Sequence, residues 1–399
     1  MSSGYELHQK LRTKTVRLVK KKQYDEAIST LHSGALTLLS QSEQGSGCDL
    51  AVYMIDVYNS KDAPVDSDSR DRITEILAQA APDFWRKKVV DAAVKWSVKA
   101  SGASTGDPLL RLFIAKMYAK EGDFEHAEGH FLASCIETEQ TYAVESAPKA
   151  YAQAMAEWLT AFAEQASQQE GETRGADAIA RIEAGRFALR ATIPLLANHA
   201  VKPALSFQEN YLSVVTTSLK SLLLPVTPNP RPYTPPGSPT PSTDIQLYLT
   251  ANPDLNFSQL AVALVSESHK LQRRGVPEWL RNAWIQLVRQ YEREAPSLSQ
   301  EEGVREAIPR IGEDWFGLKV QRGGGGGNML NEMMASLFGG APGGGAGQGR
   351  AEEKRQIQGA GAAPKAKSAV QSGAPAAAAA QAAAAPTATA DDLVDDEMD

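Results

Sequence analysis

Two histidines lie four residues apart in the segment HAEGH, at His126 and His130. On one helix this spacing brings both rings to the same face, where a pair of imidazoles can bind zinc. The sequence has no third ligand nearby, and it lacks the glutamate that follows the first histidine in the HExxH pattern of metalloproteases. We therefore interpret the pair as surface or groove histidines, and we expect neither a metal nor another cofactor.

Other residue types that could do chemistry stand in unsuitable surroundings. The five glycines at 323–327 are followed by no Lys-Ser or Lys-Thr, so they do not predict a phosphate-binding loop. The paired acids Asp395 and Asp396 lie in low-complexity sequence, where a general acid cannot be positioned. Cys48 and Cys135 are far apart and outside any CxxC pair, which predicts two small core residues in a reducing compartment. These features favour a binding protein over an enzyme.

Charge and hydropathy restrict the function classes further. The 399 residues include 41 Lys+Arg and 48 Asp+Glu, for a net charge of -7, so a general nucleic-acid role is not indicated. No run of eighteen apolar residues suggests a membrane span, and the segment MSSGYELHQKLRTK lacks the apolar stretch of a signal peptide. We expect a cytosolic protein.

Helical periodicity runs through residues 5–320. A first helix carries Leu7, Leu11, Leu18 and Val19 on one side. Capping and proline signals place later helix starts at Pro82, Asp107-Pro108, Pro148 and Pro277, and a capping box at Ser299 and Glu302. Further helices are predicted near 24–40, 48–60, 69–80, 175–189, 207–223, 257–273 and 300–309.

The helices include a degenerate repeat. QYDEAISTL (23–31) and DFEHAEGHFL (123–132) share an aromatic residue, an acid and then an alanine, Ala27 or Ala127. LFIAKMYAKEGDFEHAEGHF is typical of a helix, a tight glycine turn and a second helix, as in tetratricopeptide hairpins. The predicted fold class is therefore all-α, a right-handed solenoid of degenerate tetratricopeptide-like helical hairpins.

Residues 225–241, PVTPNPRPYTPPGSPTP, interrupt this pattern with eight prolines, so they predict an extended, mobile insertion. After them, DIQLYLT (244–250) alternates Ile245, Leu247 and Leu249 with polar residues, which indicates a strand. A single strand is unstable alone, and SLLLPV (221–226) is its expected mate in a small β-hairpin near 221–250.

Three regions are expected: N-terminal repeats at 5–165, C-terminal repeats with the hairpin at 166–322, and a disordered Gly/Ala/Pro-rich tail at 323–399 with an acidic end. Within the tail, NMLNEMMASLF (328–338) and DDLVDDEMD (391–399) could each be a docking peptide or simply solvated chain.

A basic face marks the first helix, with seven cations between positions 10 and 22. One interpretation is a solvated helix face, because lysines are mostly exposed. The other is a docking site for an acidic protein, whose association would be sensitive to salt. Membrane-surface binding is a third option, although the apolar stripe has no Trp or Phe to anchor it.

Three segments of the chain share the pattern of one known family. They are YDEAISTLHSGALTLL with DLAVYMIDVY, then FIAKMYAKEGDFEHAEGHFLAS, and finally YLTANPDLNFSQLAVALV with VRQYEREAPSLSQEEGVREAIPRIGEDWFGL. The last segment ends in the IGxxxFG pattern of Ile311, Gly312, Phe316 and Gly317. Together, these segments resemble the Golgi-to-ER traffic protein 4 family. The resemblance covers about residues 5–320 in order, and the proline-rich insertion and the tail depart from it.

The resemblance implies a helical adaptor in the delivery of tail-anchored membrane proteins to the endoplasmic reticulum. The N-terminal half would dock on a dimeric targeting ATPase, to which a small glutamine-rich co-chaperone hands its substrate. The C-terminal half would hold a ubiquitin-like adaptor, and animal members also join a larger scaffold protein. The residues implied for ATPase docking are Lys14, Arg17, Lys20, Lys21, Asp66, Asp68, Asp71 and Glu75. Those implied for adaptor binding are Ile245, Leu247, Leu249, Leu255, Asn256, Phe257 and Leu260.

Two alternatives stay open. The chain could be a helical-repeat subunit of another assembly, of the proteasome-lid or signalosome type, but residues 300–322 are too short for the winged-helix module that usually ends those subunits. An enzyme with a helical fold would need a buried polar cluster.

Overall fold

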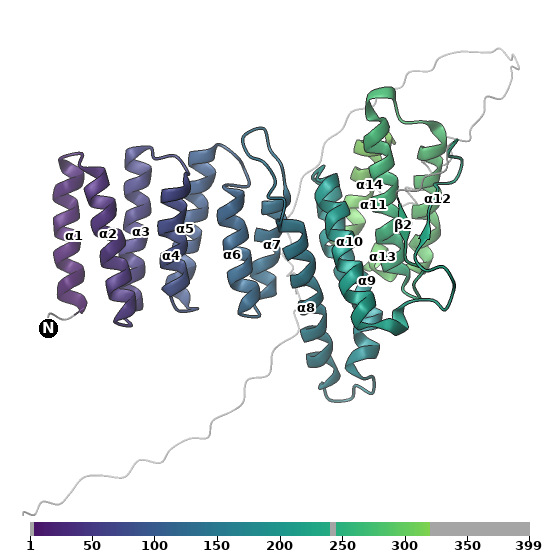
Figure 1. Ribbon diagram of the computed structural model, residues 1–399, viewed down its shortest axis with the longest axis horizontal. Coiled ribbons are helices and arrows are strands. Elements are labelled where there is room, and N and C mark those ends of the chain that lie inside the picture. Colours follow the sequence, from purple (N-terminus) through teal and green to yellow (C-terminus); the bar gives the residue numbers. More distant parts are fainter. Residues whose placement is uncertain (1–3, 240–244, 320–399) are drawn as a thin grey trace, which may run out of the picture. The chain divides into compact units, whose positions relative to one another are not determined.

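The computed structural model describes residues 4–239 and 245–319, which belong to one compact unit built as a row of helices (Figure 1). This part of the chain contains fourteen α-helices and one two-stranded antiparallel sheet, so the predicted helical-repeat fold with one small hairpin is confirmed. None of its helices is long and apolar enough to cross a membrane. The predictions for 323–399, with its glycine run, its two peptides and its paired acids, lie outside the described residues.

The helices follow one another with short connections. The first eight are α1 (Gly4–Lys20), α2 (Tyr24–Ser40), α3 (Gln44–Lys61), α4 (Ser67–Gln79), α5 (Phe84–Ser101), α6 (Pro108–Lys120), α7 (Phe124–Cys135) and α8 (Ala147–Ser167). The others are α9 (Ala176–Ala197), α10 (Val201–Ser218), α11 (Pro253–Leu271), α12 (Glu278–Glu294), α13 (Pro296–Gln300) and α14 (Glu302–Phe316).

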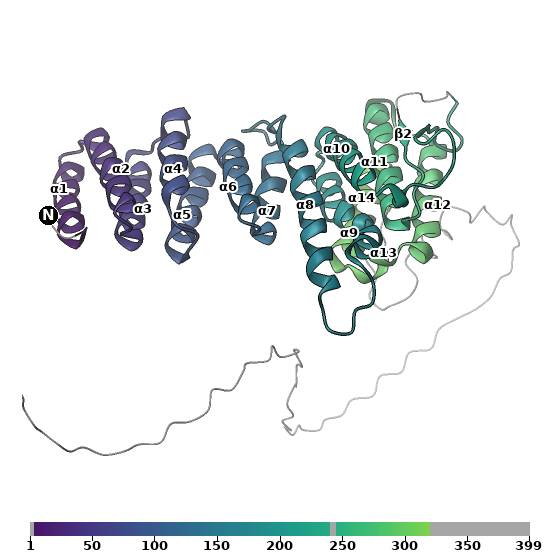
Figure 2. The same ribbon diagram turned by 60° about the horizontal axis from the view of Figure 1, so that its bottom comes forward.

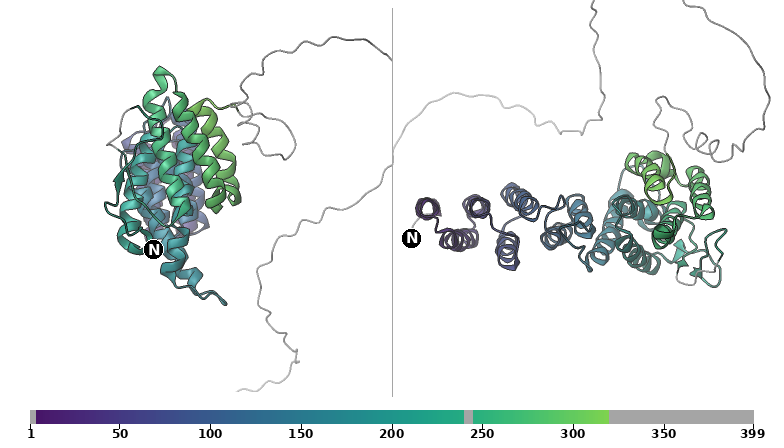
Figure 3. Two further views of the ribbon diagram at one scale, coloured as in Figure 1. Left: turned by 90° about the vertical axis from the view of Figure 1, so that its right-hand side faces the viewer. Right: turned by 90° about the horizontal axis from the view of Figure 1, so that it is seen from above.

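Helices alternate between two layers. Consecutive helices such as α2 and α3, or α6 and α7, pack on each other as hairpins. Contacts also join every second helix, with α1 on α3 and α3 on α5 in one layer, and α2 on α4 and α4 on α6 in the other. Seen from above, the N-terminal helices accordingly form two rows (Figure 3). Figure 2 shows the hairpin region beside α11 and α12 at the opposite end from α1.

Carboxylate and carboxamide caps determine where several helices begin. The Asp107 side chain accepts a hydrogen bond from the Leu110 N–H at 2.7 Å, as expected for a cap before Pro108. The helix predicted from Pro82 begins two residues later, because Asp83 accepts from the Trp85 and Arg86 N–H groups. The predicted capping box at Ser299 is wrong. Glu301 stands at the cap position of α14 and makes no side-chain cap bond.

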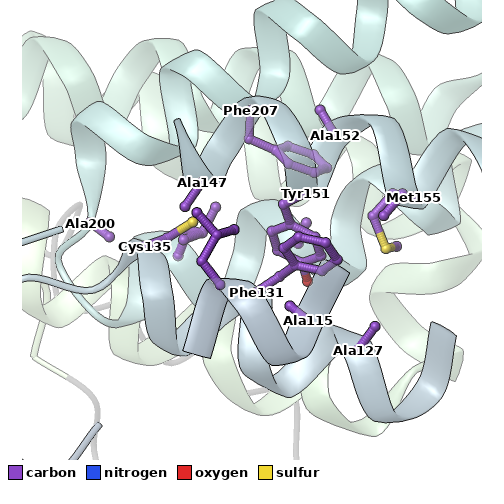
Figure 4. Packing of buried hydrophobic residues seen from close by; sticks show 14 of the residues in the cluster. Ala115, Ala127, Phe131, Cys135, Ala147, Tyr151, Ala152, Met155, Ala200 and Phe207 are labelled. Carbon is purple, nitrogen blue, oxygen red and sulfur yellow. The ribbon is translucent and has the colours of Figure 1, made fainter. Parts of the chain in front are cut away.

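The core confirms the repeat. Ala27 and Ala127 are both buried, and Gly122 adopts a left-handed conformation (φ 78°) in the turn between α6 and α7. Between α7, α8 and α10, the rings of Phe131 and Tyr151 have centroids 5.3 Å apart (Figure 4).

Both cysteines are buried free thiols, as predicted. Burial raises the pKa of Cys48 to about 11 and that of Cys135 to about 12, so neither thiol is a reactive nucleophile.

The hairpin is more elaborate than predicted. Its ladder joins β2 (Gln246–Leu247) to β1 (Arg231–Pro232), which lies within the proline-rich segment expected to be a mobile insertion. Pro232 fits because β1 is an exposed edge. The expected mate, 221–226, contributes one bridge between Leu223 and Thr250.

Candidate partner-binding groove

The segment that follows β2 is attached by side-chain amides to α11 and to residues 227–239, which we call the proline-rich arm. Gln259 on α11 is 4% exposed and binds both backbone groups of Tyr248: its Oε1 accepts from the Tyr248 N–H at 2.9 Å, and its Nε2 donates to the carbonyl at 3.0 Å. The side chain thus supplies the two bonds that a neighbouring strand would otherwise make.

The next two residues are held in the same way. Asn229 of the proline-rich arm accepts from the Leu249 N–H at 2.9 Å and donates to its carbonyl at 3.0 Å. Asn256 on α11 donates to the Thr250 carbonyl at 2.9 Å and accepts from its N–H at 3.3 Å. Three consecutive backbone units are therefore fixed by three carboxamides, which we call the amide clamps (Gln259, Asn229 and Asn256).

The start of α11 is anchored to α9. Asn252 caps α11 through the Leu255 N–H, and its Nδ2 donates to the carbonyls of Arg181 and Ile182 at 3.0 and 2.7 Å. The two helices approach so closely that a Cβ on Gly185 would lie 2.2 Å from Asn252 Oδ1. Close packing on α9 therefore positions the start of α11, the helix that carries Asn256 and Gln259.

A cavity of about 310 Å³, which we call the hairpin groove, lies between the hairpin, α10 and α11. Its apolar walls come from the hairpin and the two helices. The polar lining residues are Gln208, Glu209, Gln246, Tyr248 and Gln259. The lining residues with apolar side chains are Leu205, Leu212, Pro230, Ile245, Leu247, Val262 and Ala263. In residues 221–226, which we call the outer arm of the hairpin, Leu224 and Val226 are 40% and 37% exposed. Apolar surface gathered in this way is typical of a protein-binding site.

The residues expected to bind the adaptor divide into two groups. Ile245 and Leu247 line the groove and are half-buried, as are Leu249 and Leu260 nearby, so all four have surface to offer a partner. Leu255 and Phe257 are both 0% exposed, which contradicts a direct contact. Both belong to the hydrophobic core, where the rings of Phe257 and Tyr291 on α12 have centroids 5.8 Å apart.

The basic residues expected to contact the ATPase lie in the C-terminal half of α1 and in the turn that follows it. Lys14, Arg17, Lys20 and Lys21 are all exposed. Lys14 lies 3.6 Å from Glu26 on α2, an exposed pair that contributes little to stability.

The expected acidic residues lie at the start of α4 and along it. Asp66 is the cap of α4 and accepts from the Ser69 N–H at 2.8 Å, which lowers the pKa of its carboxyl. Asp68, Asp71 and Glu75 are exposed, and Glu75 lies 3.1 Å from His32 on α2. Both α1 and α4 pack on α2, but no described ion pair joins the basic group to the acidic one.

The chemistry considered for HAEGH is not supported. The His130 Nδ1 lies 3.1 Å from an Arg111 guanidinium nitrogen, and burial beside this cation lowers the pKa of His130 to about 4. His126 contacts Asp123 at 2.8 Å, and the described residues hold no cluster of three metal-binding side chains.

A GxSxG match also occurs at 102–106, but this segment connects α5 to α6 and lacks the strand-to-helix turn of a nucleophile elbow.

The sequence did not single out Gln259, Asn229 or Asn252. The available signal was a glutamine within the apolar run FSQLAVALV, because a buried amide must find hydrogen-bond partners.

Comparisons with known proteins agree with this fold. The chain matches the sequence profile of Golgi to ER traffic protein 4 over residues 21–338. It is 35% identical to Golgi to ER traffic protein 4 of Schizosaccharomyces pombe over 157 residues, which are 39% of this chain and 48% of that protein. In that alignment the chain therefore spans about half the relative's length.

A second relative is covered more completely. Golgi to ER traffic protein 4 of Aspergillus fumigatus is 27% identical over 369 residues, 88% of this chain and 90% of the relative. The crystal structure of C. therm. Get4 superposes with a TM-score of 0.62 at 25% identity, covering 84% of this chain and 90% of that one. Since the profile accounts for well over half of its residues, the chain belongs to the Golgi to ER traffic protein 4 family.

Proposed function

We propose that this protein is a cytosolic adaptor in the delivery of tail-anchored membrane proteins to the endoplasmic reticulum. It would hold a ubiquitin-like adaptor at the hairpin groove and a dimeric targeting ATPase at α1 and α4. The observation that carries the proposal is the hairpin groove itself, whose wall is fixed by three amide clamps and lined by apolar side chains.

The adaptor end is suited to durable binding. The clamps hold the hairpin in place before a partner arrives, so little conformational entropy is lost on binding. Half-buried Ile245, Leu247, Leu249 and Leu260, with exposed Leu224 and Val226, offer apolar area to bury. A lasting contact buries more than roughly 1,000 Å², so the partner would have to cover the outer arm as well as the groove.

The ATPase end is suited to reversible binding. Its basic and acidic groups are exposed side chains on α1 and α4. Attraction between exposed charges speeds association, and salt screens this attraction. Contacts of this kind therefore form and break readily.

Holding both partners on one chain would act through proximity. A co-chaperone loaded with substrate and bound through the ubiquitin-like adaptor would be kept near the ATPase at a raised effective concentration. We propose that the protein itself catalyses no bond chemistry. The alternative function is that of a scaffold subunit in another multiprotein complex. Under this alternative, the chain would bind neither the ubiquitin-like adaptor nor the targeting ATPase.

Calorimetric titration of the full chain with the N-terminal segment of the ubiquitin-like adaptor tests the groove. Leu247→Asp should weaken binding at least about tenfold, because a buried carboxylate would replace an apolar contact. Leu109→Asp is the matched control, since Leu109 on α6 is 47% exposed and remote in sequence from the groove. Equal affinities for the two variants would refute the assignment.

A further inference from the structure

A second groove lies between α8, α9 and α10. Its volume is about 290 Å³, and its walls are the C-terminal half of α8, the start of α9 and the last turns of α10. We call it the α8–α10 groove. At this size it lies at the lower limit of cavities that bind small molecules, roughly 300 Å³, so peptide side chains suit it better.

The floor of the α8–α10 groove is apolar and made largely of small residues. Leu159, Ala163, Ala180 and Val215 are buried, and Val214 is half-buried. Alanines also contribute much of the lining from α8 and α9, at Ala156, Ala163, Ala176 and Ala180. Small side chains allow a partner's backbone to approach closely, so the groove can accept the apolar face of a helix.

The rim of the groove is acidic. Glu157 and Glu164 on α8 and Asp177 on α9 are exposed and line it, whereas no Lys or Arg does. None of the three carboxylates makes an ion pair within the described residues; Glu157 only accepts a hydrogen bond from Gln153 Nε2 at 2.9 Å. The apolar floor is therefore bordered by three carboxylates without counter-charges.

We propose that the α8–α10 groove binds an amphipathic helix of a partner protein whose polar face is rich in Lys and Arg. Apolar side chains of that helix fill the floor, and its cations pair with the three carboxylates. Charge complementarity selects this occupant, since an acidic helix or an anionic membrane surface would be repelled by the rim. This site is separate from the hairpin groove and does not depend on the function proposed above.

The test uses a fluorescein-labelled peptide of about 18 residues, a length at which an isolated helix can form. Leucines at helical spacing form one face of the peptide and lysines the other. A second peptide carries glutamates in place of the lysines, and a third has the first composition in scrambled order. Anisotropy is measured with the full chain, and saturable binding is expected for the first peptide alone.

Two charge variants locate the binding. The triple variant Glu157→Gln/Glu164→Gln/Asp177→Asn should bind the basic peptide about tenfold more weakly, as expected for three exposed charge pairs. The control, Asp91→Asn/Glu125→Gln/Glu306→Gln, removes three exposed acids elsewhere and makes the same change in net charge. The affinity of this control for the basic peptide should stay within about twofold of that of the unmodified chain.

A floor variant adds an independent arm. Val214→Lys places a cation in the groove and should abolish binding, while circular dichroism checks that the helices remain. Equal losses in the two charge variants would reduce the effect to net charge and overturn the proposal. Equal binding of the scrambled peptide, or no saturable binding up to about 1 mM, would also overturn it.

Discussion

The amide clamps predict that the hairpin can be loosened without disturbing the helices. Gln259→Met keeps the length and burial of the side chain but removes both hydrogen bonds to Tyr248. Each neutral hydrogen bond contributes about 0.5–1.5 kcal/mol net, so the free energy of local opening should fall by about 1–3 kcal/mol. Since 1.4 kcal/mol corresponds to tenfold, protection against hydrogen exchange should drop about 5- to 150-fold.

Native-state hydrogen exchange of the full chain measures this effect directly. The loss of protection should centre on Tyr248, Leu249 and Thr250, while amides within α11 keep theirs. Gln79→Met is the matched control, because Gln79 is an exposed residue at the end of α4. If protection at Tyr248 changed by less than about twofold, the clamp would not be what holds the hairpin.

Three further changes probe other parts of the chain. Gly185→Ala should lower the stability by about 1–3 kcal/mol in thermal unfolding, because its Cβ would lie 2.3 Å from the Leu255 nitrogen; Gly129→Ala, with no atom within 4 Å, should be neutral or stabilising. The pKa of His130 is about 4 in the folded chain and about 6.5 in the unfolded chain, so the unfolded chain binds the extra proton and the free energy of unfolding should fall as pH drops from about 6.5 to about 4. In His130→Asn the free energy of unfolding should depend less on pH over this range. An unchanged pH dependence would contradict the burial argument. Charge reversal of the α1 basic face should weaken ATPase binding more at low salt than at high salt, and equal weakening would contradict electrostatic steering. The residues reversed are Lys14, Arg17, Lys20 and Lys21.

Local signals account for the parts of the fold that were predicted well. The cap at Asp107, the glycine turn at Gly122 and the apolar stripe of α2 each act within a few residues, so their effects can be read along the chain. The start of α11 was predicted four residues late, at 257 instead of Pro253. Asn252 and Pro253 carry the ordinary cap and first-turn signals there.

The hairpin shows where such reasoning stops. Strand character at 245–249 follows from alternation, but the choice between two mates depends on bonds across long separations. Asn229 reaches Leu249 and Gln259 reaches Tyr248 through side-chain amides, and no periodicity marks such bonds. Pairing with the proline-rich arm was therefore missed.

Leu255 and Phe257 illustrate a different limit. Family likeness indicates that a segment takes part in binding, but it does not say which face of the helix is covered by the rest of the chain. Helix α11 packs on α9, α10 and α12, and Leu255 and Phe257 are buried there, whereas Asn256 and Leu260 on the same helix stay half-buried.

The proposed function requires one chain to hold the ubiquitin-like adaptor and the targeting ATPase together, at two separate places. Sedimentation of the full chain with the ubiquitin-like adaptor and the targeting ATPase tests it most directly. We predict a single complex containing all three proteins, from which Leu247→Asp removes only the adaptor and reversal of the α1 basic face removes only the ATPase. If the two partners displaced each other, or if both variants lost the same partner, the claim would be contradicted.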